Sequence, residues 1–315
     1  MAEQQEFIVY VNGKLVPESK AVISALDRGF RWGDAVYDTE RTFNGKVFRL
    51  DKHLDRLYRS LSYTQIDPGL TWKEMEKAAL DVAEANQPLV KKYGDLFVNQ
   101  VVSRGVINPE IHKGANVAIY CVPLPFKKYA QCYVQGVRAA TSSTRRTPPE
   151  CLSPKAKMAN KMNHYVSEFE VQQVDPDMFV LMLDLHGNVT EGSASNFMFV
   201  SKGRIKVPNR RNVLEGITMV TILEMAETQG IPFDENDYTP SDVYTADEAF
   251  FCNTSACLIP VKSLNGRKIG REVPGPMTKS LFAAFNEMAG FDVVDQALSF
   301  LTLAERQALM AEKKG

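Results

Sequence analysis

The sequence predicts a two-domain α/β protein, and three observations support this prediction. The length of 315 residues corresponds to about two domains of roughly 150 residues each. Hairpin signals near the N-terminus are followed by amphipathic helical segments. The segment Pro123-Leu124-Pro125 then interrupts the strand pattern, because proline cannot continue a central strand. We therefore expect a smaller N-terminal α/β domain over residues 1–123, a linker over 124–131 and a larger C-terminal domain over 132–315.

Two Asn-Gly dipeptides predict that the chain opens with a small antiparallel sheet. Asn12-Gly13 lies between two strand-like segments, and Asn44-Gly45 lies between two more. Both residue types tolerate the positive φ angles that tight hairpin turns require. The segments that flank these turns, 7–11, 14–17, 41–43 and 47–50, are expected to be strands.

Two helices are expected to pack on this sheet. Leu54, Leu57 and Leu61 recur at helical spacing after Asp51, which predicts one apolar stripe. Thr71 with Glu74 has the spacing of a capping box at the start of the second helix. The segments 96–102 and 117–122 are apolar and β-branched, as is typical of strands, and they end at Pro123-Leu124-Pro125.

The remaining chain predicts a second sheet with helices, and no internal repeat. A proline-containing loop over 142–154 separates the first strand of this block from the first helix. The expected strands are 134–141, 179–183, 196–200, 249–252 and 257–261, and the expected helices are 160–174, 216–229 and 276–289.

Composition excludes several broad classes of protein. A formal net charge of -1 gives no strong overall field toward nucleic acid or an anionic membrane. Hydrophobic residues make up 44%, and no apolar run reaches the roughly 20 residues of a membrane helix. The five cysteines include no C-x-x-C pair, and the N-terminus has no secretory pattern. We expect a cytoplasmic protein without a disulfide framework, a nucleic-acid partner or a membrane partner.

Candidate chemistry is dispersed along the chain. The four histidines lack metal-ligand spacing, so no metal site is predicted. Lysines at 155, 157 and 161 follow the proline-containing loop, and such lysines are either solvated or, in a partly desolvated pocket, nucleophilic. The other candidates are the Glu191 carboxylate, the helix start at Gly216-Ile217-Thr218, which favours anions, and the hydroxyl-rich loop Asn253-Thr254-Ser255.

Taken in order, these motifs resemble those of the fold-type IV pyridoxal-phosphate enzymes. The resemblance runs through GDAVYDTER, HLDRL, SPKAKMAN, GNVTEGSASNF, LEGIT and FFCNTSA, and covers nearly the whole chain. It implies a fold-type IV architecture with a barrel-like β core in the C-terminal domain, pyridoxal 5'-phosphate as cofactor, and transfer of an amino group to a 2-keto acid. It also implies a homodimer whose active sites lie between the two domains.

The resemblance assigns a role to each matching residue. Lys157 matches the Schiff-base lysine that also moves the proton during catalysis, with Lys161 and then Lys155 as alternatives. Glu191 matches the carboxylate beside the pyridine nitrogen, and Leu214 matches the leucine packed on the ring. The phosphate-binding set is Arg56, Gly216, Ile217, Thr218 and Thr254. The substrate-binding set is Tyr37, Thr39, Arg41, Arg146 and Ser255, with Arg145 as an alternative to Arg146.

Departures from the family patterns bear on the substrate. D-amino acid aminotransferases carry an Arg and a His where this chain has Pro109 and Ile111. Branched-chain enzymes carry Phe-Glu-Gly at Tyr37-Asp38-Thr39 and a tyrosine at Met162. The stretch RRTPPECLSPKAK resembles (R)-selective amine transaminases, so we expect (R)-amine or D-configured donors. Branched-chain or D-amino acid aminotransferase activity and a lyase of the aminodeoxychorismate type are the alternatives, and a non-catalytic binding module is a further one.

Overall fold

The computed structural model describes residues 6–106, 108, 110 and 114–312. These residues form two compact units, which are described one at a time. The first comprises Met1–Leu124 together with Lys155–Lys161, and the second comprises Pro125–Pro154 and Met162–Gly315. The segment that contains Lys157 therefore belongs to the first unit although it lies in the middle of the chain.

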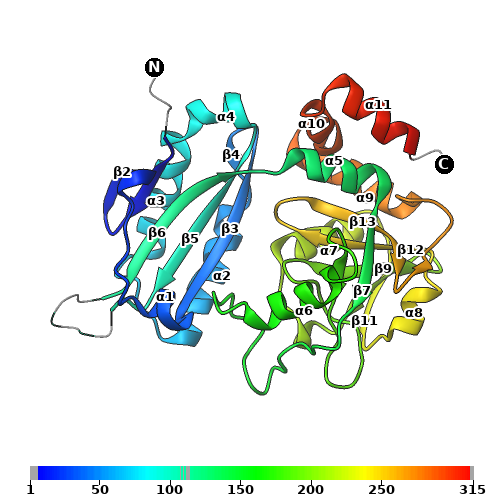
Figure 1. Ribbon diagram of the computed structural model, residues 1–315, viewed down its shortest axis with the longest axis horizontal. Helices are drawn as coiled ribbons and strands as arrows, with labels where there is room; N and C mark the ends of the chain where they lie inside the picture. The colour runs from blue at the N-terminus through cyan, green and yellow to red at the C-terminus, as the bar shows by residue number, and fades with distance from the viewer. Residues whose placement is uncertain (1–5, 107, 109, 111–113, 313–315) are drawn as a thin grey trace. The chain divides into compact units, whose positions relative to one another are not determined.

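The first unit is built on a six-stranded antiparallel sheet (Figure 1). Asn12 and Asn44 occupy the two hairpin turns with φ angles of 48° and 50°, which confirms both predicted turns. Register pairs Tyr37 with Val101 and Asn99 with Tyr120. In the order β2-β1-β6-β5-β3-β4, the strands are Lys14–Pro17, Ile8–Val11, Asn116–Pro123, Leu96–Ser103, Ala35–Phe43 and Lys46–Val47.

Two helices cover one face of this sheet, as predicted. Helix α2 (Leu50–Thr64) packs against β3, and helix α3 (Trp72–Ala85) packs against β6, β5 and β1 (Figure 1). The capping box of Thr71 with Glu74 is present at the start of α3. The buried leucines of α2 join the apolar residues of the sheet in one core. Two shorter helices, α1 (Arg28–Trp32) and α4 (Gln87–Tyr93), complete the unit.

The lysine-bearing segment Lys155–Lys161 bonds to the edge of β3. The Tyr37 N–H donates to the Lys157 carbonyl at 3.0 Å, and the Ala159 N–H donates to the Ala35 carbonyl at 2.8 Å. The Lys157 N–H donates to Ser60 Oγ of α2 at 2.9 Å. Backbone bonds on both sides therefore fix the position of residue 157 against β3 and α2.

The second unit is built on an eight-stranded mixed sheet. Its interior holds a group of buried phenylalanines that includes Phe197, Phe199, Phe250 and Phe251. Along the order β11-β10-β9-β12-β13-β7-β8, with β14 beside β13, the strands are Phe233–Asn236, Arg204–Pro208, Asn196–Ser201, Glu248–Asn253, Cys257–Leu264, Val137–Thr141, Phe179–Leu181 and Arg267–Lys268.

Helix α5 covers residues Phe126–Gln135, where the sequence predicted a linker over 124–131 and the start of a strand. Its buried residues Phe126, Tyr129, Ala130 and Tyr133 recur at helical spacing, and Phe126 stacks on Phe300. Helices α10 and α11 pack on α5 (Figure 1). The helices after α5 are Met162–Gln172 (α6), Ile217–Thr228 (α7), Pro240–Tyr244 (α8), Pro276–Ala289 (α9), Val293–Ser299 (α10) and Leu303–Glu312 (α11).

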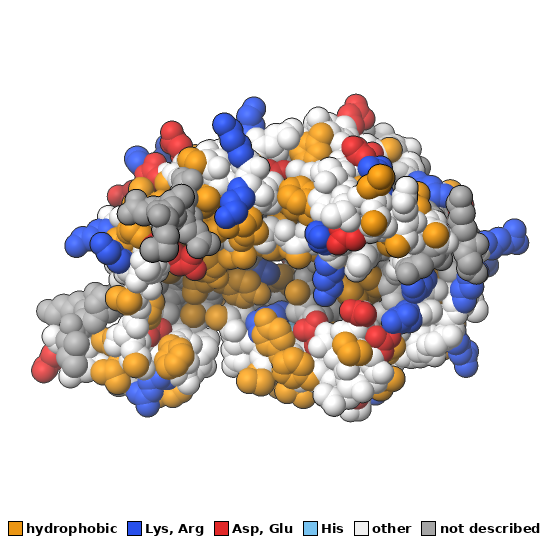
Figure 2. Space-filling model, turned by 45° about the horizontal axis from the view of Figure 1, so that its top comes forward, with side chains coloured by type: hydrophobic (Ala, Val, Ile, Leu, Met, Phe, Trp, Pro, Cys, Tyr) orange, Lys and Arg blue, Asp and Glu red, His pale blue; other side chains and the backbone are white. Residues whose placement is uncertain are grey.

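The surface carries charges of both signs. On the face in Figure 2, lysine and arginine side chains are spread over several places and lie among acidic ones. Among the described residues, no helix has both the length and the apolar character that crossing a membrane requires.

Candidate active site

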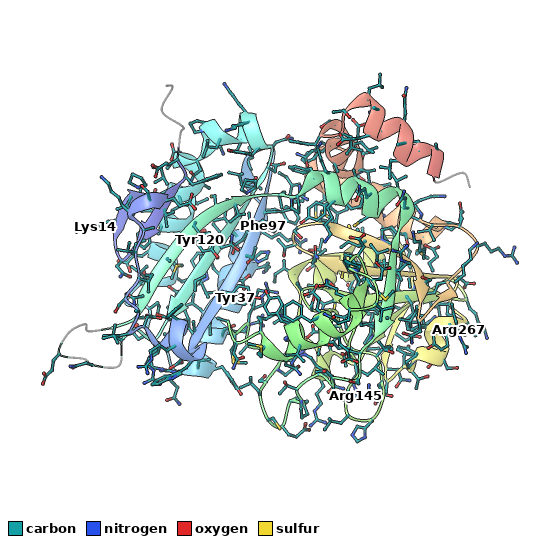
Figure 3. The ribbon with its side chains drawn as sticks, viewed as in Figure 1. Lys14, Tyr37, Phe97, Tyr120, Arg145 and Arg267 are labelled. Atoms are coloured by element: carbon teal, nitrogen blue, oxygen red, sulfur yellow. The ribbon has the colours of Figure 1, made fainter. Side chains whose placement is uncertain are left out.

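Lys157 presents its amine to an aromatic ring of β3. Its Nζ lies 4.6 Å from the centre of the Tyr37 ring, and both side chains are half-buried. Figure 3 shows Tyr37 on β3. The electron-rich ring face attracts a positively charged amine, so this contact defines where the end of the Lys157 side chain lies.

The opposite face of β3 carries a buried charged cluster against α2. Arg56 donates from Nε to Asp38 Oδ2 at 2.9 Å and from Nη2 to Asp38 Oδ1 at 2.7 Å. His53 Nδ1 lies 2.8 Å from Asp38 Oδ1, and because a carboxylate only accepts, Nδ1 carries the ring proton. Asp38, Arg56 and His53 are each at most 2% exposed. The guanidinium is therefore held side-on by one carboxylate in the interior of the unit.

Burial and the ion pair shift the pKa values of this cluster in different directions. Burial alone would raise the pKa of Asp38, but the charge and hydrogen bonds of Arg56 outweigh it and hold that pKa well below its usual range. Burial, assisted by the charge of Asp38, raises the pKa of Glu40 well above its usual value. Burial also lowers the pKa of His53, in spite of its hydrogen bond to Asp38. The directions of these pKa shifts leave Asp38 ionised and His53 neutral at neutral pH, and they favour the protonated form of Glu40.

Glu191 is the centre of a hydrogen-bonded group in the second unit. Arg146 Nε donates to Oε1 at 2.8 Å, and the Leu214 N–H donates to Oε2 at 3.0 Å. Asn196 Nδ2 donates to Oε2 at 3.3 Å and to the Leu214 carbonyl at 2.8 Å. His164 Nε2 is 3.8 Å from Oε1. These donors orient the buried Glu191 carboxylate beside Leu214, and the roles of both residues at the pyridine ring stay predictions.

The remaining predicted phosphate ligands lie close to this carboxylate in the fold of the second unit. Gly216 is the N-cap of α7, and no side chain caps that helix. A Cβ at Gly216 would lie 2.0 Å from Asn196 Oδ1, so only glycine fits there. The pairing of Cys252 with Asn196 brings the turn with Thr254 and Ser255 to the same end of the sheet. Ile217 and Thr218 are buried in the first turn of α7.

Some of the predicted substrate residues are half-buried, and the two arginines among them are buried. Tyr37 and Thr39 are half-buried, and Thr39 Oγ1 donates to Asn99 Oδ1 at 2.8 Å. Arg41 is 1% exposed, with its guanidinium 4.2 Å from the centre of the Phe43 ring. Arg146 is bonded to Glu191. Ser255 Oγ donates to Asn253 Oδ1 at 3.0 Å. The roles of these residues toward substrate stay predictions. Pro109 and Ile111, where the sequence departs from the D-amino acid aminotransferases, lie outside the described residues.

Strand pairing places further side chains with Tyr37 that the sequence did not single out. Asn99 is opposite Thr39 and also opposite Tyr120, while Phe97 is opposite Arg41. Phe97, Asn99 and Tyr120 are half-buried, and Figure 3 shows Phe97 and Tyr120 on neighbouring strands of the same sheet as Tyr37. Only the register of β3, β5 and β6 could have grouped them, because they are more than fifty residues from Tyr37 in the chain.

The Arg146–Glu191 pair yields a stability prediction. Arg146→Met removes one partner of a buried ion pair, so we expect the free energy of unfolding to fall by about 3–5 kcal/mol. Arg145→Met is the matched control, since Arg145 is an exposed neighbour that donates only to the Ser142 carbonyl, and it should cost less than about 1 kcal/mol. Urea denaturation followed by circular dichroism measures both. Equal losses for the two variants would contradict the buried pairing.

Comparison with known proteins places the chain in a family. Residues 35–264 match the family model described as amino-transferase class IV. The chain belongs to the class IV aminotransferases. It is 33% identical over 294 residues to the "Putative branched-chain-amino-acid aminotransferase" of Methanocaldococcus jannaschii, covering 91% of this chain and 99% of that protein. It is 31% identical over 280 residues to the D-alanine aminotransferase of Bacillus licheniformis, covering 88% and 95%.

A solved structure supports the same assignment. The branched-chain aminotransferase from the thermophilic archaeon Thermoproteus uzoniensis, solved with norvaline, superposes with a TM-score of 0.80 at 31% identity and covers 95% of this chain and 99% of that one. This confirms the predicted fold class. Class IV aminotransferases are enzymes that use pyridoxal 5'-phosphate, so the predicted enzyme class and cofactor are confirmed as well.

Each of the two units, taken by itself, offers side chains of the kinds that this cofactor requires. An aldehyde requires an amine, which Lys157 offers over the Tyr37 ring. A protonated pyridine nitrogen requires a carboxylate, which Glu191 offers with three donors around it. A phosphate requires cationic and N–H donors, which Arg56 and the uncapped start of α7 offer.

Proposed function

We propose that this class IV aminotransferase moves an amino group between a primary amine or amino acid and a 2-keto acid with Lys157 as its catalytic residue. The observation that carries the assignment of Lys157 is its amine over the Tyr37 ring, held there by backbone bonds to β3. Glu191 is proposed to bind the pyridine nitrogen and Leu214 to pack on the ring. Arg56, Gly216, Ile217, Thr218 and Thr254 are proposed to bind the phosphate.

The residues divide the chemical work among themselves. Bound pyridoxal phosphate supplies an electrophilic carbon and a ring that accepts electrons. Lys157 would hold the cofactor through its amine, and the same amine would move a proton at the substrate carbon. Glu191 keeps the ring nitrogen protonated, and Arg146 and Asn196 hold that carboxylate in place. Arg56 would hold the cofactor phosphate through its guanidinium.

We propose donors of (R) or D configuration, with Tyr37, Thr39, Arg41, Arg146 and Ser255 on the substrate side. The support is the chain's departure from the branched-chain pattern at Tyr37-Asp38-Thr39 and Met162, together with the similarity to a D-alanine aminotransferase. We expect D-alanine or an (R)-amine to react about tenfold or more faster than L-leucine, a ratio within reach of pocket contacts. A panel of both enantiomers with pyruvate and 2-oxoglutarate measures this. Faster turnover of L-leucine would instead favour the branched-chain alternative.

A lyase of the aminodeoxychorismate type would use the same lysine and cofactor. It would release pyruvate without an amino acceptor, whereas the proposed transaminase requires a keto acid for every turnover. Measuring pyruvate released from aminodeoxychorismate without a keto acid separates the two reactions.

We also propose a cytoplasmic homodimer. An apolar stripe on α6 supports a subunit contact, because Met162, Tyr165, Val166 and Phe169 recur at helical spacing and are 46–65% exposed. Large exposed apolar surfaces commonly mark sites of association. Sedimentation should give twice the chain mass of 35.3 kDa, and a monomer at micromolar concentration would contradict the dimer.

A further inference from the structure

Glu40 and Gln100 bring polar atoms without partners into the buried cluster around Arg56. Both side chains are 0% exposed. Among the described residues, neither carboxylate oxygen of Glu40 and neither amide atom of Gln100 makes a hydrogen bond of good geometry, although the Gln100 side chain lies close enough to the Glu40 carboxyl to favour its ionised form weakly. Gln100 pairs with Asp38 across β3 and β5, and Glu40 Oε1 lies 3.9 Å from His53 Nδ1. Such buried orphan atoms are rare in folded proteins and require an explanation.

A bound metal ion does not explain the carboxylates. The ligand atoms of Asp38, Glu40 and His53 lie within 4.8 Å of one another. Asp38, however, already accepts from Arg56 on both oxygens, and from His53 and the Thr39 N–H on Oδ1. The guanidinium is thus the cation of this cluster. Asp38 and Arg56 cancel each other, so with a neutral His53 the charge of the cluster depends on whether Glu40 carries a proton.

We propose that Glu40 is a positioning residue that carries a proton in the working enzyme, and that loss of this proton weakens the hold of Arg56 on the cofactor phosphate. The proposal rests on the phosphate-binding role of Arg56 given above. An ionised Glu40 would compete with the phosphate for the guanidinium and would repel the phosphate dianion. At the effective dielectric of a protein interior, a unit charge several ångströms away changes binding by about tenfold or more.

The groups around Glu40 come from several elements. Asp38 on β3, His53 and Arg56 on α2, and Cys121 on β6 are the titratable groups whose electrostatic or hydrogen-bond contacts reach it. Gln100 on β5 has no titratable group. Besides burial, the charge of Lys157 acts on His53 and contributes to lowering its pKa. The directions of their pKa shifts keep His53 and Cys121 neutral near pH 7, so Glu40 is the group of this cluster whose proton we propose to change the charge beside Arg56.

The test compares two forms of the cofactor that differ only in phosphate. Cofactor-free protein is titrated with pyridoxal phosphate and with pyridoxal from about pH 7 to about pH 10, where the phosphate is fully dianionic. The ratio of the two dissociation constants isolates the phosphate, because both ligands bond to Lys157 through the same aldehyde. For the unaltered protein we expect the advantage of the phosphate form to fall about tenfold across this range. For Glu40→Gln, which is neutral at every pH, we expect it to stay constant.

One control variant and two possible results that would contradict the proposal or the phosphate site complete this experiment. Glu248→Gln replaces another buried glutamate, one that accepts from the N–H groups of Met277 and Thr278, and it should behave like the unaltered protein. Identical profiles for the unaltered protein and Glu40→Gln would overturn the role of Glu40. If the unaltered protein binds pyridoxal phosphate no more tightly than pyridoxal, the phosphate site itself is wrong.

A second measurement does not depend on the folding of the variant. Infrared difference spectra of the unaltered protein between about pH 7 and about pH 10 should show loss of a protonated carboxyl band over the range in which the phosphate advantage falls. Absence of this loss overturns the proposal.

Discussion

Replacing Lys157 with alanine is expected to lower the rate of amino transfer by about 10³-fold or more, since the variant loses both its covalent link to the cofactor and its general base. The structure gives the amine a defined place over the Tyr37 ring. The backbone bonds that hold the segment on β3 do not involve this side chain. The variant should therefore fold normally, and single-turnover kinetics with a saturating donor measures the loss directly.

The neighbouring lysines provide matched controls for this prediction. Lys155→Ala and Lys161→Ala should each keep activity within a few-fold of the unaltered enzyme, because the proposed catalytic lysine is residue 157, whose N–H donates to Ser60 Oγ of α2 and whose carbonyl accepts from the Tyr37 N–H of β3. Borohydride reduction followed by peptide mapping should place the pyridoxyl group on residue 157. Finding it on residue 161, the alternative from the sequence, would move the catalytic role there.

Replacing Asp38 with asparagine is expected to reduce the free energy of unfolding by about 3–5 kcal/mol, the usual cost of removing one partner of a buried ion pair. Arg56 would keep its charge at 2% exposure and lose the carboxylate that binds its Nε and Nη2. Asp34→Asn is the control, because Asp34 binds the more exposed Arg28 and Arg104, and such pairs contribute about 1 kcal/mol or less.

The difference in stability between the unaltered protein and Asp38→Asn is expected to decrease at acid pH. The pKa of Asp38 is lower in the folded protein than the value of about 3.9 in an unfolded chain. Its contribution is therefore complete above about pH 4 and is lost as the pH falls through the folded pKa. Thermal unfolding of the unaltered protein and of Asp38→Asn should be measured from about pH 7 to about pH 3. The difference between their free energies of unfolding should become smaller at the acid end of this range. A gap that widens below pH 4 would contradict the ion pair.

Local sequence signals were sufficient for much of the first unit. Asn12 and Asn44 were placed in turns because few other residues adopt positive φ without strain, and both do so. The prolines at 123 and 125 were less informative. They predicted a linker because they end a strand, but the apolar stripe from Phe126 to Tyr133 buries itself as helix α5, and burial outweighed the local signal.

The candidate site was predictable only as far as its motifs extend along the chain. Lys157, Glu191 and Arg56 could be proposed as site residues because each lies in a short segment that matches a family motif. The bonding of Arg146 to Glu191 could not be anticipated, since an arginine in a polar loop has no signal that names its partner. The same holds for Glu40 and Gln100, whose burial depends on the register of β3 and β5.

The attachment of Lys155–Lys161 to β3 has a consequence for synthesis on the ribosome. Residues up to 124 contain every named strand of the first sheet, yet Ala35 and Tyr37 keep backbone groups without these partners until residue 159 has emerged. Unpaired strand edges recruit other chains. During translation the N-terminal portion therefore exposes an unpaired strand edge that can bind other chains. The segment Lys155–Lys161, which contains Lys157, covers this edge once it has been synthesised.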